Sequence, residues 1–259
     1  MPIVAAAVVP HSPLLLPTVA KDHAPLLAAT TNAMNAIAEL CYAAQPEVMI
    51  LLTPHGESHD DTIVINAAET YRGNFTEFGD LTTTVTARGA LGVVHQLKTL
   101  AEREHLPLVL QTAPELDYGT TVPLTLLQSK HFQLPIIPIS LPYHTPELLL
   151  RTGGVLHDFL SSANLRSMII ASADMTRRKE RTPATHRRPT TEERQLSAAI
   201  VAVDPAQATA VKPQTSTCGF GPIVTLLSTL DGLSREGKIT SFEAPLGVGL
   251  LTATFTLST

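Results

Sequence analysis

Two histidines in matching surroundings are the residues of this chain best suited to metal chemistry. His11 follows the apolar run IVAAAVVP, and His55 follows EVMILLTP. In α/β proteins ligands bind beyond the carboxyl ends of the strands, and a proline ends a strand and starts a loop. Imidazole nitrogens are common ligands of transition metals. The two histidines are therefore a candidate pair of metal ligands delivered by separate strands.

A cysteine is a candidate third donor. Cys218 precedes an apolar pattern that predicts a helix over 221–233. A helix N-terminus stabilises a thiolate, which is the form of cysteine that binds metal or attacks carbon. Cys218 could equally be a small buried side chain, as free cysteines commonly are, and we expect Cys41, in its amphipathic helical pattern, to be one. We expect His59, four residues after His55, to be a surface residue.

Charged residues near predicted strand ends could complete a site. Asp174 follows an apolar strand pattern, and Asp117 precedes a helical segment near 121–130. Either carboxylate could face a shared pocket or serve as a turn or cap residue. A basic stretch over 177–189 has no apolar periodicity, so it is either a solvated loop or an anion clamp over a pocket. The chain lacks a G-x-S-x-G elbow, a phosphate loop and a G-x-G-x-x-G fingerprint.

Short apolar runs alternate with longer helical patterns, which predicts an α/β fold with a mostly parallel central sheet flanked by helices. The expected strands are Ile3–Val9, Glu47–Leu52, Thr62–Ala67, Leu106–Gln111, Pro135–Ile139, Ser167–Ser172 and Gly247–Phe255. The expected helices are Lys21–Tyr42, Ala90–Glu104, Thr145–Leu160, Glu192–Val203 and Gly221–Leu233. Thr145 before a proline predicts an N-cap, and Thr190 with Glu193 predicts a capping box.

Composition narrows the class of protein. The chain has 259 residues, 44% of them apolar, with no visible linker, so we expect a single domain over residues 1–259. A net charge of -5 argues against a general nucleic-acid binder. No apolar run reaches the length of a membrane span, and the N-terminus lacks the basic region of a signal peptide. Two cysteines exclude a disulfide framework, so we expect a cytoplasmic protein.

Taken in order, several short segments resemble the LigB-type, or class III, extradiol dioxygenase superfamily, which includes the Memo proteins. The matching segments are Val9-Pro10-His11, Thr53-Pro54-His55-Gly56, residues 73–79 (GNFTEFG), Leu116-Asp117-Tyr118-Gly119, Ser172-Ala173-Asp174-Met175-Thr176-Arg177, Cys218-Gly219 and residues 243–249 (EAPLGVG). The resemblance implies an α/β fold with a metal in a cleft at one sheet edge. In the dioxygenases two histidines and a glutamate hold Fe(II), and the two histidines match His11 and His55.

Three positions depart from the dioxygenase pattern. Thr217 stands where the resemblance implies the glutamate ligand, Tyr118 where it implies a histidine, and Arg177 where it implies the acid-base histidine. A neutral hydroxyl is a poor substitute for a carboxylate, and arginine cannot release a proton near neutral pH. Arginine can hold a carboxylate or phosphate, and Tyr118 can donate a hydrogen bond to a bound oxygen. Standard ring cleavage is therefore expected to be disabled or rebuilt.

The pattern is more similar to the Memo proteins, which carry two histidines and a cysteine. Here these residues match His11, His55 and Cys218. A site of two nitrogens and a thiolate favours zinc or copper over Fe(II), although the site could also be without metal. Memo-like proteins carry a further histidine where this chain has Arg177, so the match to that branch is incomplete.

The first hypothesis is thus a divergent LigB/Memo member that binds a metal or a small aromatic or anionic ligand without standard ring cleavage. Its site would comprise the three metal ligands together with Tyr118, Asp174 and Arg177. The second is an active dioxygenase that recruits Asp174, Asp117 or Glu57 as third ligand. The third is a thiol enzyme using Cys218, and the fourth a binding protein on an old enzyme fold. Self-association into a homo-oligomer is expected for this family.

Overall fold

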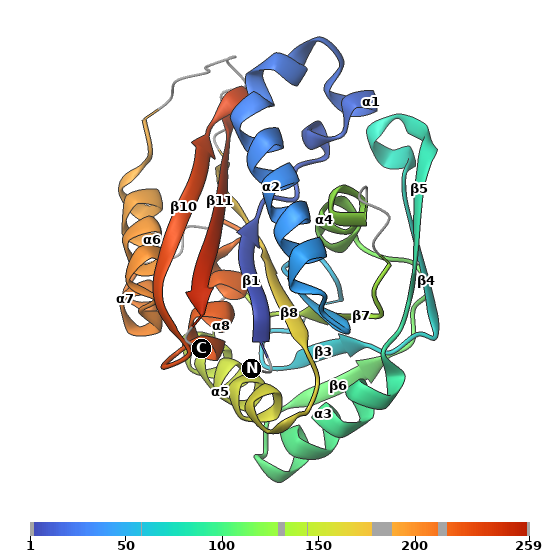
Figure 1. The fold of residues 1–259 in the computed structure, drawn as a ribbon, viewed down its shortest axis with the longest axis vertical. Helices are drawn as coiled ribbons and strands as arrows, with labels where there is room; N and C mark the ends of the chain where they lie inside the picture. Colours follow the sequence, from blue (N-terminus) through green and yellow to red (C-terminus); the bar gives the residue numbers. More distant parts are fainter. Residues whose placement is uncertain are drawn as a thin grey trace.

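A nine-stranded mixed sheet runs through the part of the chain that the computed structural model describes, which is residues 3–57, 59–128, 133–143, 145–177, 188–211 and 217–257. The strand order is β10-β11-β1-β8-β2-β7-β3-β6, and β9 pairs with β11 (Figure 1). The strands are β1 (Ile3–Val9), β2 (Val48–Thr53), β3 (Ile63–Asn66), β6 (Leu108–Gln111), β7 (Ile136–Ser140), β8 (Ser167–Ser172), β9 (Asp174–Arg177), β10 (Ser234–Glu243) and β11 (Val248–Leu257).

The centre of the sheet is parallel and fully covered. Strands β1, β8, β2 and β7 run in the same direction, whereas β11 and β3 flank them antiparallel. Every residue of β2 and β8 is buried, as expected for strands packed on both faces. The predicted α/β class with a mostly parallel central sheet is therefore confirmed.

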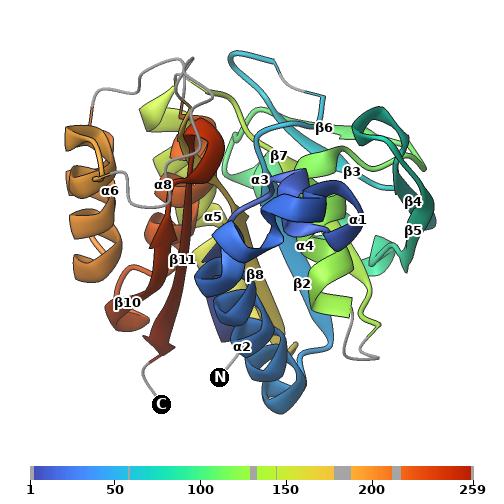
Figure 2. The ribbon, with the colours of Figure 1, turned by 90° about the horizontal axis from the view of Figure 1, so that it is seen from above.

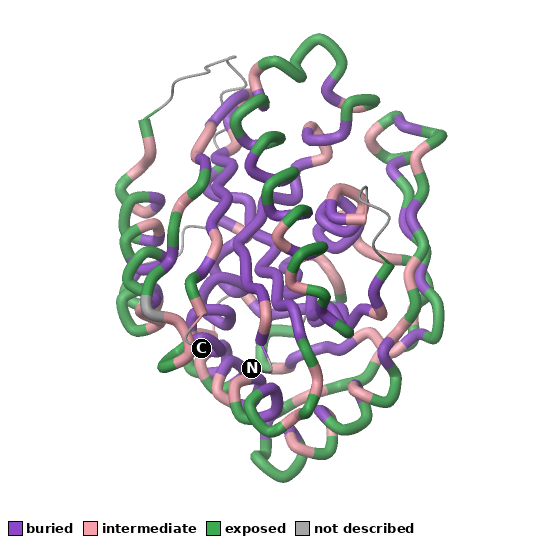
Figure 3. Tube along the Cα trace, viewed as in Figure 1, coloured by how far each residue is buried: buried purple, intermediate pink, exposed green. Residues whose placement is uncertain are grey.

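Helices cover both faces of this sheet. The helices are α1 (Pro17–Ala20), α2 (Ala28–Ala44), α3 (Leu91–Arg103), α4 (Tyr118–Gln128), α5 (Pro146–Ser162), α6 (Thr191–Ala202), α7 (Pro205–Thr209) and α8 (Phe220–Thr229). Because side chains alternate along a strand, Ile50 packs in one core with α3, α5 and α8, and Leu51 packs in another with α2 and α4. Figure 2 shows the two helical layers, and Figure 3 shows the buried strands between them.

A separate two-stranded ribbon was not predicted. Strands β4 (Thr70–Phe75) and β5 (Asp80–Arg88) form an antiparallel pair joined by the short helix η3 (Thr76–Phe78). Only alternate residues of β4 are buried, and β5 is mostly exposed and rich in threonine, so neither contains an apolar run. The edge strand β10 was missed for the same reason, because it is largely polar.

The two predicted helix starts have different outcomes. The capping box is confirmed, because Thr190 accepts a hydrogen bond from the Glu193 amide and the Glu193 carboxylate accepts one from the Thr190 amide. Thr145 is the N-cap of α5 with Pro146 at its first position, as predicted, but its hydroxyl donates to the carbonyl of Asp60 and makes no capping bond. Among the described residues, no helix is both long and apolar enough to cross a membrane.

Candidate metal centre

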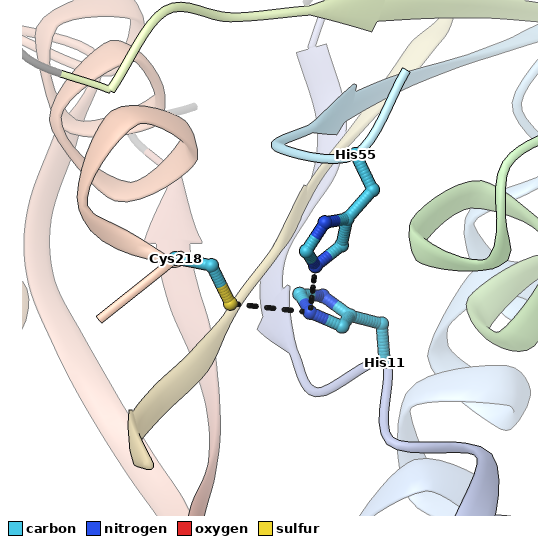
Figure 4. A group of neighbouring side chains, drawn as sticks. All are labelled: His11, His55 and Cys218. Carbon is cyan, nitrogen blue, oxygen red and sulfur yellow. Dashed lines mark hydrogen bonds between the residues drawn. The ribbon is translucent and has the colours of Figure 1, made fainter. Parts of the chain in front are cut away.

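The parallel strands bring both histidines to one edge of the sheet. His11 follows β1 and His55 follows β2, and both strands pair with β8, which lies between them. Cys218 lies two residues before α8, next to Thr217, which pairs with Thr176 of β9. Figure 4 shows the three side chains pointing toward one another from these separate elements.

The donor atoms of His11, His55 and Cys218, here called the His-His-Cys cluster, lie within 4.8 Å of one another. The two Nε2 atoms are 3.0 Å apart, and Cys218 Sγ lies 3.3 Å from His11 Nε2. The His11 side chain is buried, whereas His55 and Cys218 are partly exposed. Among the described histidine, cysteine, aspartate and glutamate residues, this is the group whose donor atoms could hold a metal ion.

A serine determines which nitrogen of His11 carries the proton. The Ser172 hydroxyl donates its hydrogen to the carbonyl of Gly119 and lies 2.9 Å from His11 Nδ1. Because that hydrogen is already used, the serine oxygen can only accept from Nδ1–H. His11 therefore presents the lone pair of Nε2 toward the cluster, which is the orientation that a metal ligand requires.

Burial keeps both imidazoles neutral. Desolvation, followed by the positive charge of Arg177, lowers the pKa of His11 from 6.5 to about 3. Desolvation and the neighbouring His11 lower the pKa of His55 to about 4. Neutral imidazole is the metal-binding form, so the two histidines need not lose a proton to bind a metal at neutral pH.

In the metal-free protein the surroundings of Cys218 favour the neutral thiol over the thiolate. Burial, followed by the nearby charge of Asp174, raises the pKa of Cys218 to about 12. This cost outweighs any stabilisation from the N-terminus of α8, because the thiol is largely removed from water. A bound cation would stabilise the thiolate, whereas a metal-free nucleophile would have to act from the neutral thiol.

Asp174 contacts His11 through both oxygens of its carboxylate. One carboxylate oxygen accepts a hydrogen bond from the backbone amide of His11, and the other lies 3.8 Å from His11 Nε2. Desolvation raises the pKa of this fully buried carboxyl to about 6. Asp174 thus positions His11. Of the three carboxylates considered as a third metal ligand, it is the one that lies close to the cluster.

The other two carboxylates proposed as recruited ligands have different partners. Asp117 accepts hydrogen bonds from the hydroxyls of Thr53 and Thr120. Glu57 is exposed and pairs with His59, whose side chain is half exposed as predicted. Asp117 therefore joins the end of β2 to the start of α4, and Glu57 lies at the surface.

Tyr118 enters the site at the first residue of α4. Its hydroxyl lies 2.9 Å from His55 Nε2, and the two rings stack with centroids 4.3 Å apart. The next residue must be glycine, because a Cβ at Gly119 would lie 2.6 Å from Thr53 Oγ1 and 3.1 Å from His55 Cδ2. This close approach is what allows α4 to begin directly beside His55.

Arg177 lies at the end of β9 and is exposed. Its positive charge affects the pKa values of His11, His55 and Asp174, so it lies near these residues. Thr217, at the position of the family glutamate, is buried with its hydroxyl 3.5 Å from that of Thr176. The basic stretch, interpreted as either a solvated loop or an anion clamp, falls mostly on residues 178–187, which lie outside the described residues.

Two functional neighbours had no predicted role. Ser172 was part of a matching segment with no role assigned to it, yet its hydroxyl determines which ring nitrogen of His11 carries the proton. Phe78, from η3, contacts Tyr118 edge to face with ring centroids 5.5 Å apart. A polar residue at the end of an otherwise apolar strand was the available signal for Ser172. No local signal pointed to Phe78, because its role depends on where the β4–β5 ribbon lies.

Comparison with known proteins places this geometry in a family. Residues 5–237 match the family described as "Catalytic LigB subunit of aromatic ring-opening dioxygenase". The chain therefore belongs to the LigB family, the class that its sheet and histidine pair define. Members of this family usually bind a metal.

One curated relative and one solved structure are similar to the chain over nearly its full length. Protein CA_C1420 of Clostridium acetobutylicum is 24% identical over 255 residues, which are 93% of this chain and 54% of that protein. The chain thus spans about half the length of this relative. The crystal structure of the uncharacterized protein JW3007 from Escherichia coli K12 has a TM-score of 0.64 at 14% identity, covering 98% of this chain and all of that one. This second likeness supports the fold alone.

Proposed function

We propose that this protein holds a divalent metal ion, zinc or copper, through His11, His55 and Cys218, and does not carry out standard extradiol ring cleavage. The observation that carries the proposal is the convergence of the three donors, with the His11 Nε2 lone pair turned toward the others by Ser172. Two imidazoles and one thiolate suit zinc or copper better than Fe(II).

A small anionic ligand would bind beside the metal. Arg177 is exposed, and its charge reaches the buried groups of the site. When bound, a divalent metal adds positive charge close to the guanidinium, which favours an anion there. The guanidinium would orient a carboxylate or phosphate through a bidentate hydrogen bond, but it cannot serve as an acid or base.

The proposal is tested by the metal content of protein purified without added metal or chelator. We expect about one equivalent of zinc or copper in the wild type and a loss of that metal in His11→Ala and Cys218→Ala. His59→Ala is the matched control, because His59 is an exposed histidine close to His55 in sequence. Retention of metal by both site variants, or absence of metal from reconstituted wild type, would refute the proposal.

An active extradiol dioxygenase is the second candidate, and the position of Asp174 favours it. Its carboxylate oxygen lies 3.8 Å from His11 Nε2, so a small displacement would make it a carboxylate ligand beside two histidines. The test is oxygen uptake by Fe(II)-loaded protein with a panel of catechols. Turnover that disappears in Asp174→Asn supports this candidate, and no turnover with any catechol removes it.

A further inference from the structure

The ring of Tyr118 is held between two other rings. His55 stacks on it at an interplanar angle of 25°, and Phe78 contacts it edge to face at 71°. Its backbone is fixed by Asp117, whose carboxylate accepts hydrogen bonds from the Thr120 amide and the Thr53 hydroxyl. Tyr118 therefore cannot move away from His55 without disturbing both η3 and the start of α4.

The Tyr118 hydroxyl meets the same atom that a metal would use. It lies 2.9 Å from His55 Nε2, which is itself 3.0 Å from His11 Nε2. Within the described part of the chain, His55 Nε2 is the hydrogen-bond partner recorded for this hydroxyl. A metal bound to His55 Nε2 would occupy the side of this nitrogen that now contacts the hydroxyl, so the phenol oxygen would need a new partner.

We propose that the phenol oxygen of Tyr118 is a fourth ligand of the metal, an inference that rests on the proposed His-His-Cys metal site. Zinc prefers four ligands in a tetrahedron, with bonds of about 2.0–2.1 Å to nitrogen or oxygen and about 2.3 Å to sulfur. These lengths place neighbouring ligand atoms about 3.3 Å apart, or about 3.6 Å when one is sulfur. Three of the separations among the four atoms are 2.9, 3.0 and 3.3 Å, slightly shorter than these values. The three donors of the His-His-Cys cluster all lie within 4.8 Å of one another.

Charge supports the same assignment. The thiolate of Cys218 and the phenolate of Tyr118 together balance the two positive charges of the metal, with two neutral histidines completing the set. On binding, the Cys218 S–H and the Tyr118 O–H each release one proton to solvent, and no electron is transferred. Such a site has all four positions filled by protein, as in structural zinc sites, so the anionic ligand would bind at Arg177 and not on the metal.

The test is ultraviolet difference spectroscopy as Zn(II) is added to metal-free protein at constant pH. Formation of a tyrosinate gives an absorption change that a neutral phenol does not. We expect this signal in the wild type, its loss in Tyr118→Phe, and its retention in Tyr143→Phe. Tyr143 is the matched control, because it is a nearby tyrosine whose hydroxyl donates to the Pro54 carbonyl. Tyr118→Phe should also bind Zn(II) at least tenfold more weakly, and its melting curve checks that it remains folded.

Each outcome distinguishes the two proposals. One equivalent of bound Zn(II) without a tyrosinate signal overturns the role of Tyr118 and leaves the His-His-Cys site intact. A tyrosinate signal that persists in Tyr118→Phe also overturns that role. If the wild type binds neither Zn(II) nor copper, the metal site itself is refuted, and the fourth ligand with it.

Discussion

Replacement of Ser172 with alanine tests the claim that this hydroxyl controls His11. Ser172 is fully buried, and its oxygen connects His11 Nδ1 to the Gly119 carbonyl. Alanine leaves a buried N–H and a buried C=O without partners, each at a cost of about 1–3 kcal/mol. We therefore expect the free energy of unfolding to fall by roughly 2–6 kcal/mol. Metal affinity should fall about 10–100-fold, as it does when outer partners of histidine ligands are removed.

Ser167→Ala is the matched control for this prediction. Ser167 is equally buried at the other end of β8, and its hydroxyl donates only to the nearby Leu165 carbonyl. Chemical denaturation measures stability, and competition with a chelator of known affinity measures Zn(II) binding. If Ser172→Ala keeps wild-type Zn(II) affinity, or loses no more than Ser167→Ala, the assignment of the His11 proton is wrong.

Three further predictions concern pH, a buried carboxylate and thiol reactivity. Because the pKa values of His11 and His55 are lowered to about 3 and about 4, the unfolded chain binds more protons than the folded one below pH 6.5. The free energy of unfolding of the metal-free protein should therefore fall as the pH is lowered from 6.5 to about 4. Protonation of Asp174, whose pKa is raised to about 6, partly offsets this fall. Denaturant titrations that show constant stability across this range would contradict the prediction. Glu193→Ala should lower the free energy of unfolding by on the order of 3 kcal/mol, and Glu193→Gln by less, because the buried carboxylate accepts two backbone N–H bonds. Cys218 should react slowly with iodoacetamide at pH 7 because its pKa is about 12; modification as rapid as that of a free thiol would restore the thiol-enzyme hypothesis.

The central part of the fold was predictable because its strands are apolar throughout. Ile3–Val9 and Ser167–Ser172 were predicted with the bounds that the structure has. A strand buried on both faces needs apolar residues at every position, and this pattern is visible without tertiary information. The β4–β5 ribbon and β10 were missed, because strands exposed on one face carry polar residues that resemble those of loops.

The donors of the candidate site were predictable in identity but not in protonation. A proline-histidine pair after an apolar strand indicated His11 and His55, and a position before an apolar helical pattern indicated Cys218, which the resemblance also matches. The choice between a thiolate and a buried neutral thiol at Cys218 stayed open, since a helix N-terminus can be read from the sequence whereas the burial that raises this pKa cannot. The part played by Ser172 depends on its contact with Gly119, a residue 53 positions away in the chain.

The sequence by itself determined the α/β class and the residue types able to bind a metal, because hydrophobic periodicity and strand-ending prolines are local properties. Only the tertiary structure decided that β8 lies between the two histidine-bearing strands, so that their Nε2 atoms lie 3.0 Å apart. It also decided which nitrogen of His11 is free and where the Tyr118 oxygen lies. These features depend on contacts between segments far apart in the chain, and no local pattern of residues encodes such contacts.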